Sequence, residues 1–311
     1  MSIDPPSIPN GADPESTRPR TWRGPEPHAL HRLLLAACRD PEVSAQAAWN
    51  RWLQEGRFDT EDPASFELAS LAVGRLGTLA GQGSEANRCR GWQRRSWFLS
   101  EIAVAAAGRL HETSQRMGLP LTAVGDIATY HAGLHFAGRP FPVRSLEFHL
   151  PGANSDDLRH LHAAAMQGPA GEAIRSRRLS LILRPNSRHP SVHTPAGRIV
   201  WLVSRNWCRF PTGRVRWILE LLATIESAPD QPSLPRAIAD EARSFGTLAA
   251  VAEALRWINA AGIDGTGLHP IVALLSTEPI PLASRIRLWH ARHQLGLGLR
   301  ARYARRLHPA G

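Results

Sequence analysis

The stretch from residue 118 to residue 151 constrains the fold of this 311-residue chain more than any other part of it. A short apolar run at 119–124 has the composition of a β-strand, and Gly125 ends that run. Residues 127–136 have the pattern of one short helix, with Asp126 in the position of its N-cap. A strand, a glycine turn and a helix therefore open the predicted core.

A second strand with two different faces follows. A Gly-Arg-Pro turn at 138–140 leads into residues 143–150, whose side chains alternate in polarity until Pro151. Side chains two residues apart lie on the same face of a strand. The polar face carries Ser145, Glu147 and His149. This face is either the remnant of a functional site or a solvated strand surface.

Helical patterns on both sides of this stretch divide the chain into four parts. The proline-rich residues 1–27 predict a disordered tail, and residues 28–90 predict an N-terminal helical segment. Residues 91–190 hold the predicted core, with a further strand at 178–184, and residues 191–311 predict a C-terminal helical domain. The expected fold class is therefore α+β, a small mixed sheet with extensive N-terminal and C-terminal helices.

Three further expectations concern the helices. The longest helical pattern runs from Arg94 to Met117, and Asn154 is placed to cap a helix that ends near Met166. Tryptophans in helical runs are expected mostly in the core: Trp92, Trp97, Trp201, Trp207, Trp217, Trp257 and Trp289.

The central stretch resembles an uncharacterised bacterial nucleotidyltransferase-like family whose genes often lie near polysaccharide or peptide-modification genes. That family carries Lys-Gly at the first turn and Arg-Pro-Met-x-Asp-Ile-Asp-Leu-Leu-Val-Pro at the second strand. The corresponding residues here are Val124-Gly125 and the run from Pro142 to Pro151. A later run, Arg214 to Leu222, is similar to the family's Arg-Leu-Arg-Trp-Leu-Leu-Asp-Leu. The resemblance implies a mixed sheet of the nucleotidyltransferase type.

The same resemblance implies that most of the family's catalytic groups are absent. Val124 stands at the lysine, while Ser145 and Glu147 stand at the two aspartates of the Asp-x-Asp motif. Ser180 stands at the third acidic position, on the strand at 178–184. Nucleotidyl transfer needs carboxylates that hold divalent cations against the triphosphate. Because a serine hydroxyl carries no charge to offset Mg²⁺, we expect no metal site, and Mg²⁺ only with residual activity.

We therefore expect a degenerate nucleotidyltransferase, a pseudoenzyme that binds a partner protein, a peptide or a nucleotide in a bacterial biosynthetic pathway. The expected binding residues are Arg144, Glu147, His149 and Arg184. Since Ser145 and Ser180 should be partly exposed at the cleft, aspartates at these positions should be tolerated. One alternative is an active nucleotidyltransferase built around Glu147, with carboxylates drawn from Asp126, Asp156 or Asp157.

The second alternative is an Arg-rich nucleic-acid-binding module. The formal net charge is +10, and all 37 basic side chains are arginine. Such a charge suits an anionic partner, and a basic amphipathic pattern at 283–307 could contact phosphates or an anionic membrane surface. A GC-rich genome also favours arginine codons, so the charge alone does not decide the function.

The cysteine and histidine spacings favour no metal or disulfide chemistry. Cys38, Cys89 and Cys208 are isolated, with no Cys-x-x-Cys pair. His131 and His135 are four residues apart on a predicted helix, but no neighbouring ligand completes a site, so packing or partner contact is expected. Without a signal-type start or an apolar run of membrane-span length, the expected location is the cytoplasm.

Overall fold

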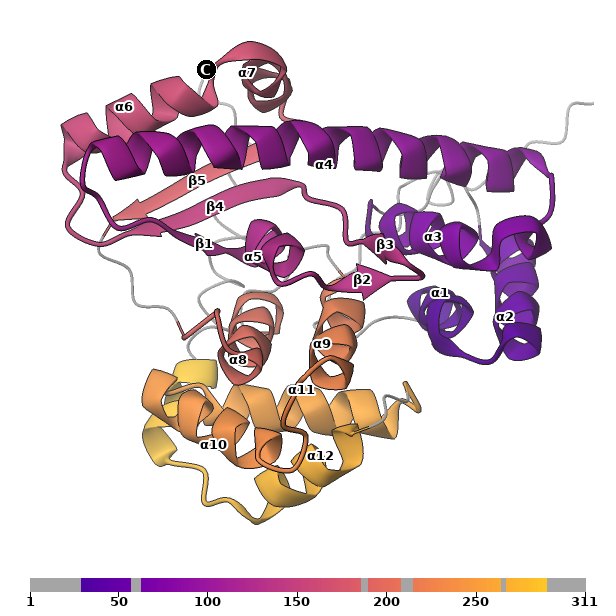
Figure 1. Cartoon of the computed structure of the whole chain (residues 1–311). Coiled ribbons are helices and arrows are strands. Elements are labelled where there is room, and N and C mark those ends of the chain that lie inside the picture. The colour runs from indigo at the N-terminus through magenta and orange to yellow at the C-terminus, as the bar shows by residue number, and fades with distance from the viewer. Residues whose placement is uncertain (1–28, 57–62, 186–189, 208–214, 264–266, 290–311) are drawn as a thin grey trace, which may run out of the picture.

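The computed structural model describes residues 29–56, 63–185, 190–207, 215–263 and 267–289 (Figure 1). The expected α+β class is confirmed: the chain is mostly helical and holds a small mixed sheet. The N-terminal helices are α1 (Ala29–Arg39), α2 (Glu42–Glu55), α3 (Pro63–Leu76), the 3₁₀ turn η2 (Gly77–Ala80) and α4 (Ser84–Arg116). The central elements are β1 (Thr122–Val124), α5 (Gly125–His131), β2 (His135–Phe136), β3 (Arg139–Pro140), β4 (Ser145–Leu150), α6 (Ser155–Ala165), α7 (Gly168–Arg175) and β5 (Ser180–Pro185). The C-terminal helices are α8 (Pro195–Asn206), α9 (Trp217–Glu226), α10 (Leu234–Phe245), α11 (Leu248–Ala260) and α12 (Leu268–Thr277).

The main sheet has the strand order β1-β4-β5. β1 runs antiparallel to β4, and β5 runs parallel to β4 after the crossover through α6 and α7. The register places Val124 opposite Glu147, and Ser145 opposite Ser180. The strands expected at 143–150 and 178–184 therefore exist, with ends displaced by one or two residues.

The helix after Gly125 is shorter than the sequence predicts. Instead of reaching residue 136, α5 ends at His131, and β2 and β3 form a separate hairpin. The physical reason is a series of left-handed residues, Gly133, Ala137 and Gly138, with φ of 65°, 51° and 74°. His131 therefore lies on a helix and His135 on a strand, so the predicted single helical face for the two is wrong.

One long helix covers one face of the sheet. α4 begins at Ser84, ten residues earlier than predicted, so the expected boundary at residue 90 falls inside it. Figure 1 shows α4, α6 and α7 on one side of the sheet and α8 and α9 on the other. The side of the sheet that faces α4 and α6 forms one apolar cluster with these helices. The cluster includes Ala103, Ala107, Leu110, Leu146, Phe148, Leu150, Leu161 and Leu179. In the part of the chain that the structure describes, no helix is both long and apolar enough to cross a membrane.

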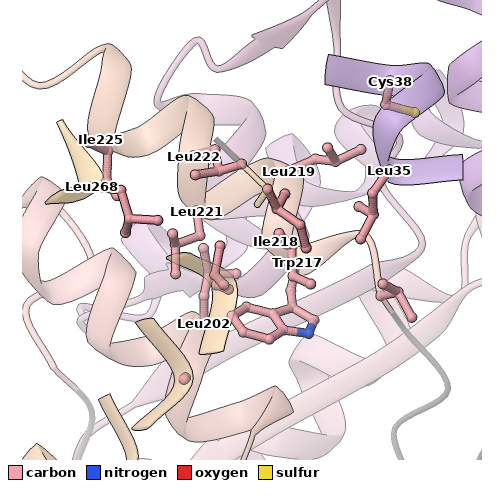
Figure 2. Close-up of a cluster of buried hydrophobic side chains, with 14 of the residues drawn as sticks. Leu35, Cys38, Leu202, Trp217, Ile218, Leu219, Leu221, Leu222, Ile225 and Leu268 are labelled. Carbon is pink, nitrogen blue, oxygen red and sulfur yellow. The ribbon is translucent and has the colours of Figure 1, made fainter. Parts of the chain in front are cut away.

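The helices at the two ends of the chain share a second core. Its buried side chains come from α1, α2 and α3 as well as from α8 to α12. Figure 2 shows part of this cluster, in which α1 contributes Leu35 and Cys38 and α9 contributes residues from Trp217 to Ile225. The N-terminal helical segment and the C-terminal helices therefore stabilise each other, although more than 100 residues separate them along the chain.

The expectation that the tryptophans lie in the core is wrong for three of them. Trp201, Trp207 and Trp217 are buried, but Trp92, Trp97 and Trp289 are 40%, 54% and 54% exposed. The reason for the two on α4 is that this helix packs through small side chains: Ala86, Cys89, Ser96, Ser100, Ala103, Ala106 and Ala107. Small residues allow close helix packing, and the bulky aromatic residues lie at the margins of this face, where Trp92 stacks on Phe66 of α3 and Trp97 lines a pocket with Leu71.

The buried thiols allow a test of this packing. Burial raises the pKa of the Cys38 and Cys89 thiols, that of Cys89 from 9.0 to about 12. We expect neither to react with iodoacetamide at pH 8 in the folded chain and both to react in urea, as read by peptide mass mapping. The folded-state pKa is the higher one, so this contribution to stability is complete below pH 9 and is lost as the pH rises towards 12. Rapid alkylation of folded Cys38 would contradict the packing of α1 on α3. Cys208 lies outside the described residues.

Candidate functional site

The polar face of β4 is buried rather than solvated. Ser145 is 1% exposed and Glu147 is fully buried, while His149 at the end of the strand is partly exposed. α8 contributes to the cover on this side, where its Trp201 forms a small apolar cluster with Val124 and Val192. The alternative of a solvated strand face is therefore wrong for Ser145 and Glu147.

The carboxylate of Glu147 lies between two arginines. Its Oε1 accepts a hydrogen bond from Nε of Arg184 at 2.8 Å, and its Oε2 is paired with Nη1 of Arg205 on α8. Arg184 lies on the neighbouring strand β5 and is in register with His149. Two guanidinium groups face one carboxylate, so this group of three side chains carries one excess positive charge.

Gly125 packs directly against this pair of interactions. It has a φ of 63°, a left-handed conformation that favours glycine. A Cβ at this position would lie 3.3 Å from Oε2 of Glu147 and 3.7 Å from Nη1 of Arg205. Gly125, the turn glycine that the sequence predicts, is therefore next to the Glu147–Arg205 ion pair. A side chain at this position would crowd the Glu147 carboxylate.

Asp126 belongs to a different buried network. Its Oδ1 accepts from Nη2 of Arg216 at 2.9 Å, and its Oδ2 accepts the backbone N–H groups of Arg144 and Ser145 at 2.9 and 3.0 Å. The N-cap position of α5 is Val124, so the expected capping role of Asp126 is wrong. The carboxylate instead ties the start of α5 to the start of β4.

Arg216 is the centre of that network, and it is 2% exposed. Its guanidinium donates to Glu67 at 2.8 Å, to Glu220 at 2.5 Å and to the Pro142 carbonyl at 2.9 Å, in addition to Asp126. Burial alone lowers the pKa of Arg216, but the three carboxylates raise it above its usual range. Burial raises the pKa of Glu220, and Arg216 opposes that rise. We call this set the Arg216 network: Glu67, Asp126, Arg144, Arg216 and Glu220.

Arg144 joins the Arg216 network and not the arginines around Glu147. Its Nε lies 3.5 Å from Oε1 of Glu67, and its Nη2 donates to Oγ of Ser96 at 3.2 Å. Because neighbouring residues on a strand point to opposite faces, Arg144 and Glu147 lie on different sides of the sheet. Of the four predicted binding residues, the structure brings Glu147 and Arg184 into contact and places His149 on the same face. Arg205 was missed, since it comes from a helix without a recognisable motif.

The two serines at the acidic positions of the family differ in exposure. Ser180 is exposed, as expected, whereas Ser145 is buried and its Oγ has no hydrogen-bond partner within the described ranges. The expected tolerance of an aspartate at residue 145 is therefore wrong, because a second carboxylate would be buried close to Asp126 and Glu147.

The carboxylates proposed for an active site are engaged elsewhere. Asn154 caps α6 as predicted, in a capping box in which it accepts from the backbone of Asp156 and Asp157. The Asp157 carboxylate accepts a hydrogen bond from the backbone N–H of Asn154, and Asp156 forms an ion pair with Arg159. Among the residues that the structure describes, no group of three or more His, Cys, Asp or Glu side chains is arranged to hold a metal ion.

Comparison of the chain with models of known protein families, with curated proteins and with solved structures found no match.

A substitution separates a structural from a catalytic role for Glu147. We expect Glu147→Gln to lower the free energy of unfolding by about 1–3 kcal/mol, because it removes the buried negative charge that Arg184 and Arg205 share. Chemical denaturation at pH 7 measures this loss. The control is Glu112→Gln on the exposed face of α4, which should change stability by less than about 0.5 kcal/mol. A Glu147→Gln variant as stable as the parent would contradict the role of the ion pairs.

The Arg216 network predicts a larger effect. Arg216→Met leaves three buried carboxylates without their common cation, so we expect a loss of about 3–5 kcal/mol at pH 7.5. The loss should shrink near pH 4.5. Burial without a cation raises the pKa of a carboxyl group, so these groups become protonated there and the cost of burying their charge disappears. Denaturant titrations at both pH values test this. The exposed Arg236→Met is the control, with an expected change below about 1 kcal/mol. A loss independent of pH would exclude this electrostatic explanation.

Proposed function

We propose that this protein is a nucleotidyltransferase-like binding subunit that no longer performs metal-dependent nucleotidyl transfer. Its function would be to hold a partner protein, a peptide or a nucleotide in a bacterial biosynthetic pathway. One observation carries the proposal: both oxygens of the buried Glu147 carboxylate are engaged by Arg184 and Arg205. A metal-binding carboxylate must present free lone pairs to the cation, and a guanidinium in that place repels Mg²⁺.

The arrangement of the strands supports the relation to nucleotidyltransferases. A strand, a glycine turn, a helix and a second strand come in the expected order, and a third strand follows parallel to the second. The residues at the family's acidic positions come together, since Ser145 is the register partner of Ser180 and Glu147 lies two residues further on β4. Gly125 is beside Glu147, as a phosphate-facing turn would be.

The charge around Glu147 supports binding of an anion. Arg184 and Arg205 keep 31% and 22% of their side-chain surface exposed, so an incoming group can approach both. One of the two arginine charges is neutralised by Glu147. The other remains to attract an anion, as the metal cation does in an active nucleotidyltransferase. A phosphate or carboxylate of the partner could then bind without a metal ion.

An assay for pyrophosphate tests the loss of transfer. We expect no pyrophosphate release from ATP, GTP, CTP or UTP, with either Mg²⁺ or Mn²⁺, because the site lacks carboxylates free to bind these ions. Release above that of a buffer blank, abolished in a Glu147→Gln variant that circular dichroism shows to be folded, would overturn the proposal. That result would instead support an active enzyme with a non-standard site.

A second candidate function rests on exposed aromatic side chains of α4. The exposed side chains of Trp97 and Phe98 follow Arg94 and Arg95 after one buried residue, Ser96. Aromatic residues near arginines are typical of single-stranded nucleic-acid binding. Many arginines are nevertheless used inside the protein, as Arg75 is by the carbonyls of Ala37 and Asp40. The salt dependence of binding to a short oligonucleotide discriminates between the two candidates.

A further inference from the structure

A pocket of about 520 Å³ opens beside β1, one of the two edge strands of the main sheet. Its walls come from α4, from α5 and from residues 192–198 at the start of α8. Leu121, Ala123 and Phe148 form part of its apolar lining. Ala123 and Phe148 are register partners on the sheet face opposite Glu147. The pocket extends around β1 to Val192 and Arg198 on the α8 side, but Glu147, Arg184 and Arg205 are not among the residues that line it.

A buried arginine lines this pocket with part of its hydrogen-bonding capacity unused. Arg198 is 8% exposed, and its Nη2 donates to the Val192 carbonyl at 3.2 Å. Its Nε is buried and has no hydrogen-bond partner in the described part of the chain. The negative charge of Glu220 acts on the Arg198 guanidinium and partly opposes the lowering of its pKa by burial. The Glu220 carboxylate itself already accepts hydrogen bonds from Arg216 and Thr129. A buried donor without a partner is costly. Because Nε has almost no accessible surface, an acceptor on a ligand would satisfy it only after a shift of the Arg198 side chain.

Three histidines from three separate elements surround the same opening. His111 lies on α4, His131 at the end of α5 and His193 just before α8, and all three are exposed. Within the described residues they do not form a metal-type cluster. Imidazoles at the rim and a guanidinium in the wall are groups that bind phosphate or carboxylate oxygens.

We propose that this pocket binds a small organic anion. Its phosphate or carboxylate group would lie against Arg198 with the histidines around it, and its apolar body would lie against Leu121, Ala123 and Phe148. The volume accommodates a ring-sized molecule, and the mixture of an apolar wall with a few polar groups is the usual composition of a small-molecule site. This inference does not depend on the loss of nucleotidyl transfer, because Glu147, Arg184 and Arg205 are not among the residues that line the pocket.

A glycine in the pocket wall provides a variant that blocks the site without disturbing the fold. Gly108 lies within α4 and lines the pocket, and a Cβ at this position meets no heavy atom within 4 Å. Gly108→Leu should therefore fill the pocket, while a better helix former replaces a glycine in a helix interior. Gly91 is a matched control, since it is exposed on the same helix, is equally free of close contacts and does not line the pocket.

The experiment is a calorimetric titration of the full-length chain with four probes. Phenyl phosphate and benzoate carry both an anion and a ring, inorganic phosphate carries only the anion, and phenol carries only the ring. We expect phenyl phosphate or benzoate to bind at least tenfold more tightly than inorganic phosphate and phenol. The tighter of the two ring compounds identifies the preferred anion as phosphate or carboxylate.

The variants decide whether that binding belongs to this pocket. Gly108→Leu should weaken binding of the preferred probe at least tenfold with an unchanged or higher melting temperature, and Gly91→Leu should leave binding unchanged. Arg198→Gln should also weaken binding at least tenfold. The proposal is overturned if neither ring compound binds better than phenol, or if the Gly108→Leu chain binds as well as the parent.

Discussion

The buried guanidinium of Arg216 is the interaction on which the rest of the structure depends. It joins Glu67 of α3, Asp126 of α5 and Glu220 of α9, and it also holds the Pro142 carbonyl before β4. These four positions come from the N-terminal helices, the central sheet and the C-terminal helices. Burying so many charges costs free energy, which is offset only when every partner is in place. The network therefore specifies how the parts of the chain fit together, more than it adds stability.

The sheet depends on the same arrangement through Asp126. One oxygen of this carboxylate binds Arg216, and the other accepts the backbone N–H groups of Arg144 and Ser145, at the beginning of β4. Two residues further along the strand, Glu147 meets Arg184 from β5 and Arg205 from α8. Asp126 and Glu147 are thus each balanced by arginine from another element. In the function that we propose, Glu147 is paired with arginines and not with a metal ion, which is why we favour binding over transfer.

Several local features could be predicted from the sequence because their causes are local. Alternating polarity predicted β4, the Asn154 cap predicted α6, and the glycine turn predicted the end of β1. Local signals failed where they were ambiguous: residues 133–138 adopt left-handed conformations that end α5 early, and Asp126 resembled a cap. The pairing of Glu147 with Arg184 was only partly predictable, as proximity of two strands. Arg205 and Arg216 could not be assigned, since no spacing along the chain links them to their partners.

The sequence by itself determined the α+β class and the order of β1, α5, β4, α6 and β5, but not the β2–β3 hairpin or α7. The class and this order follow from residue type and short-range periodicity, which act within a few residues. Only the tertiary structure decided which faces are buried: the polar side of β4 is covered, and Trp92 and Trp97 are exposed. It also decided which of the arginines in the described ranges neutralise carboxylates inside the protein and which line a pocket. The physical reason is that burial and ion pairing depend on contacts between residues far apart in the chain, and a charge has the same sequence signature whether it is solvated or buried.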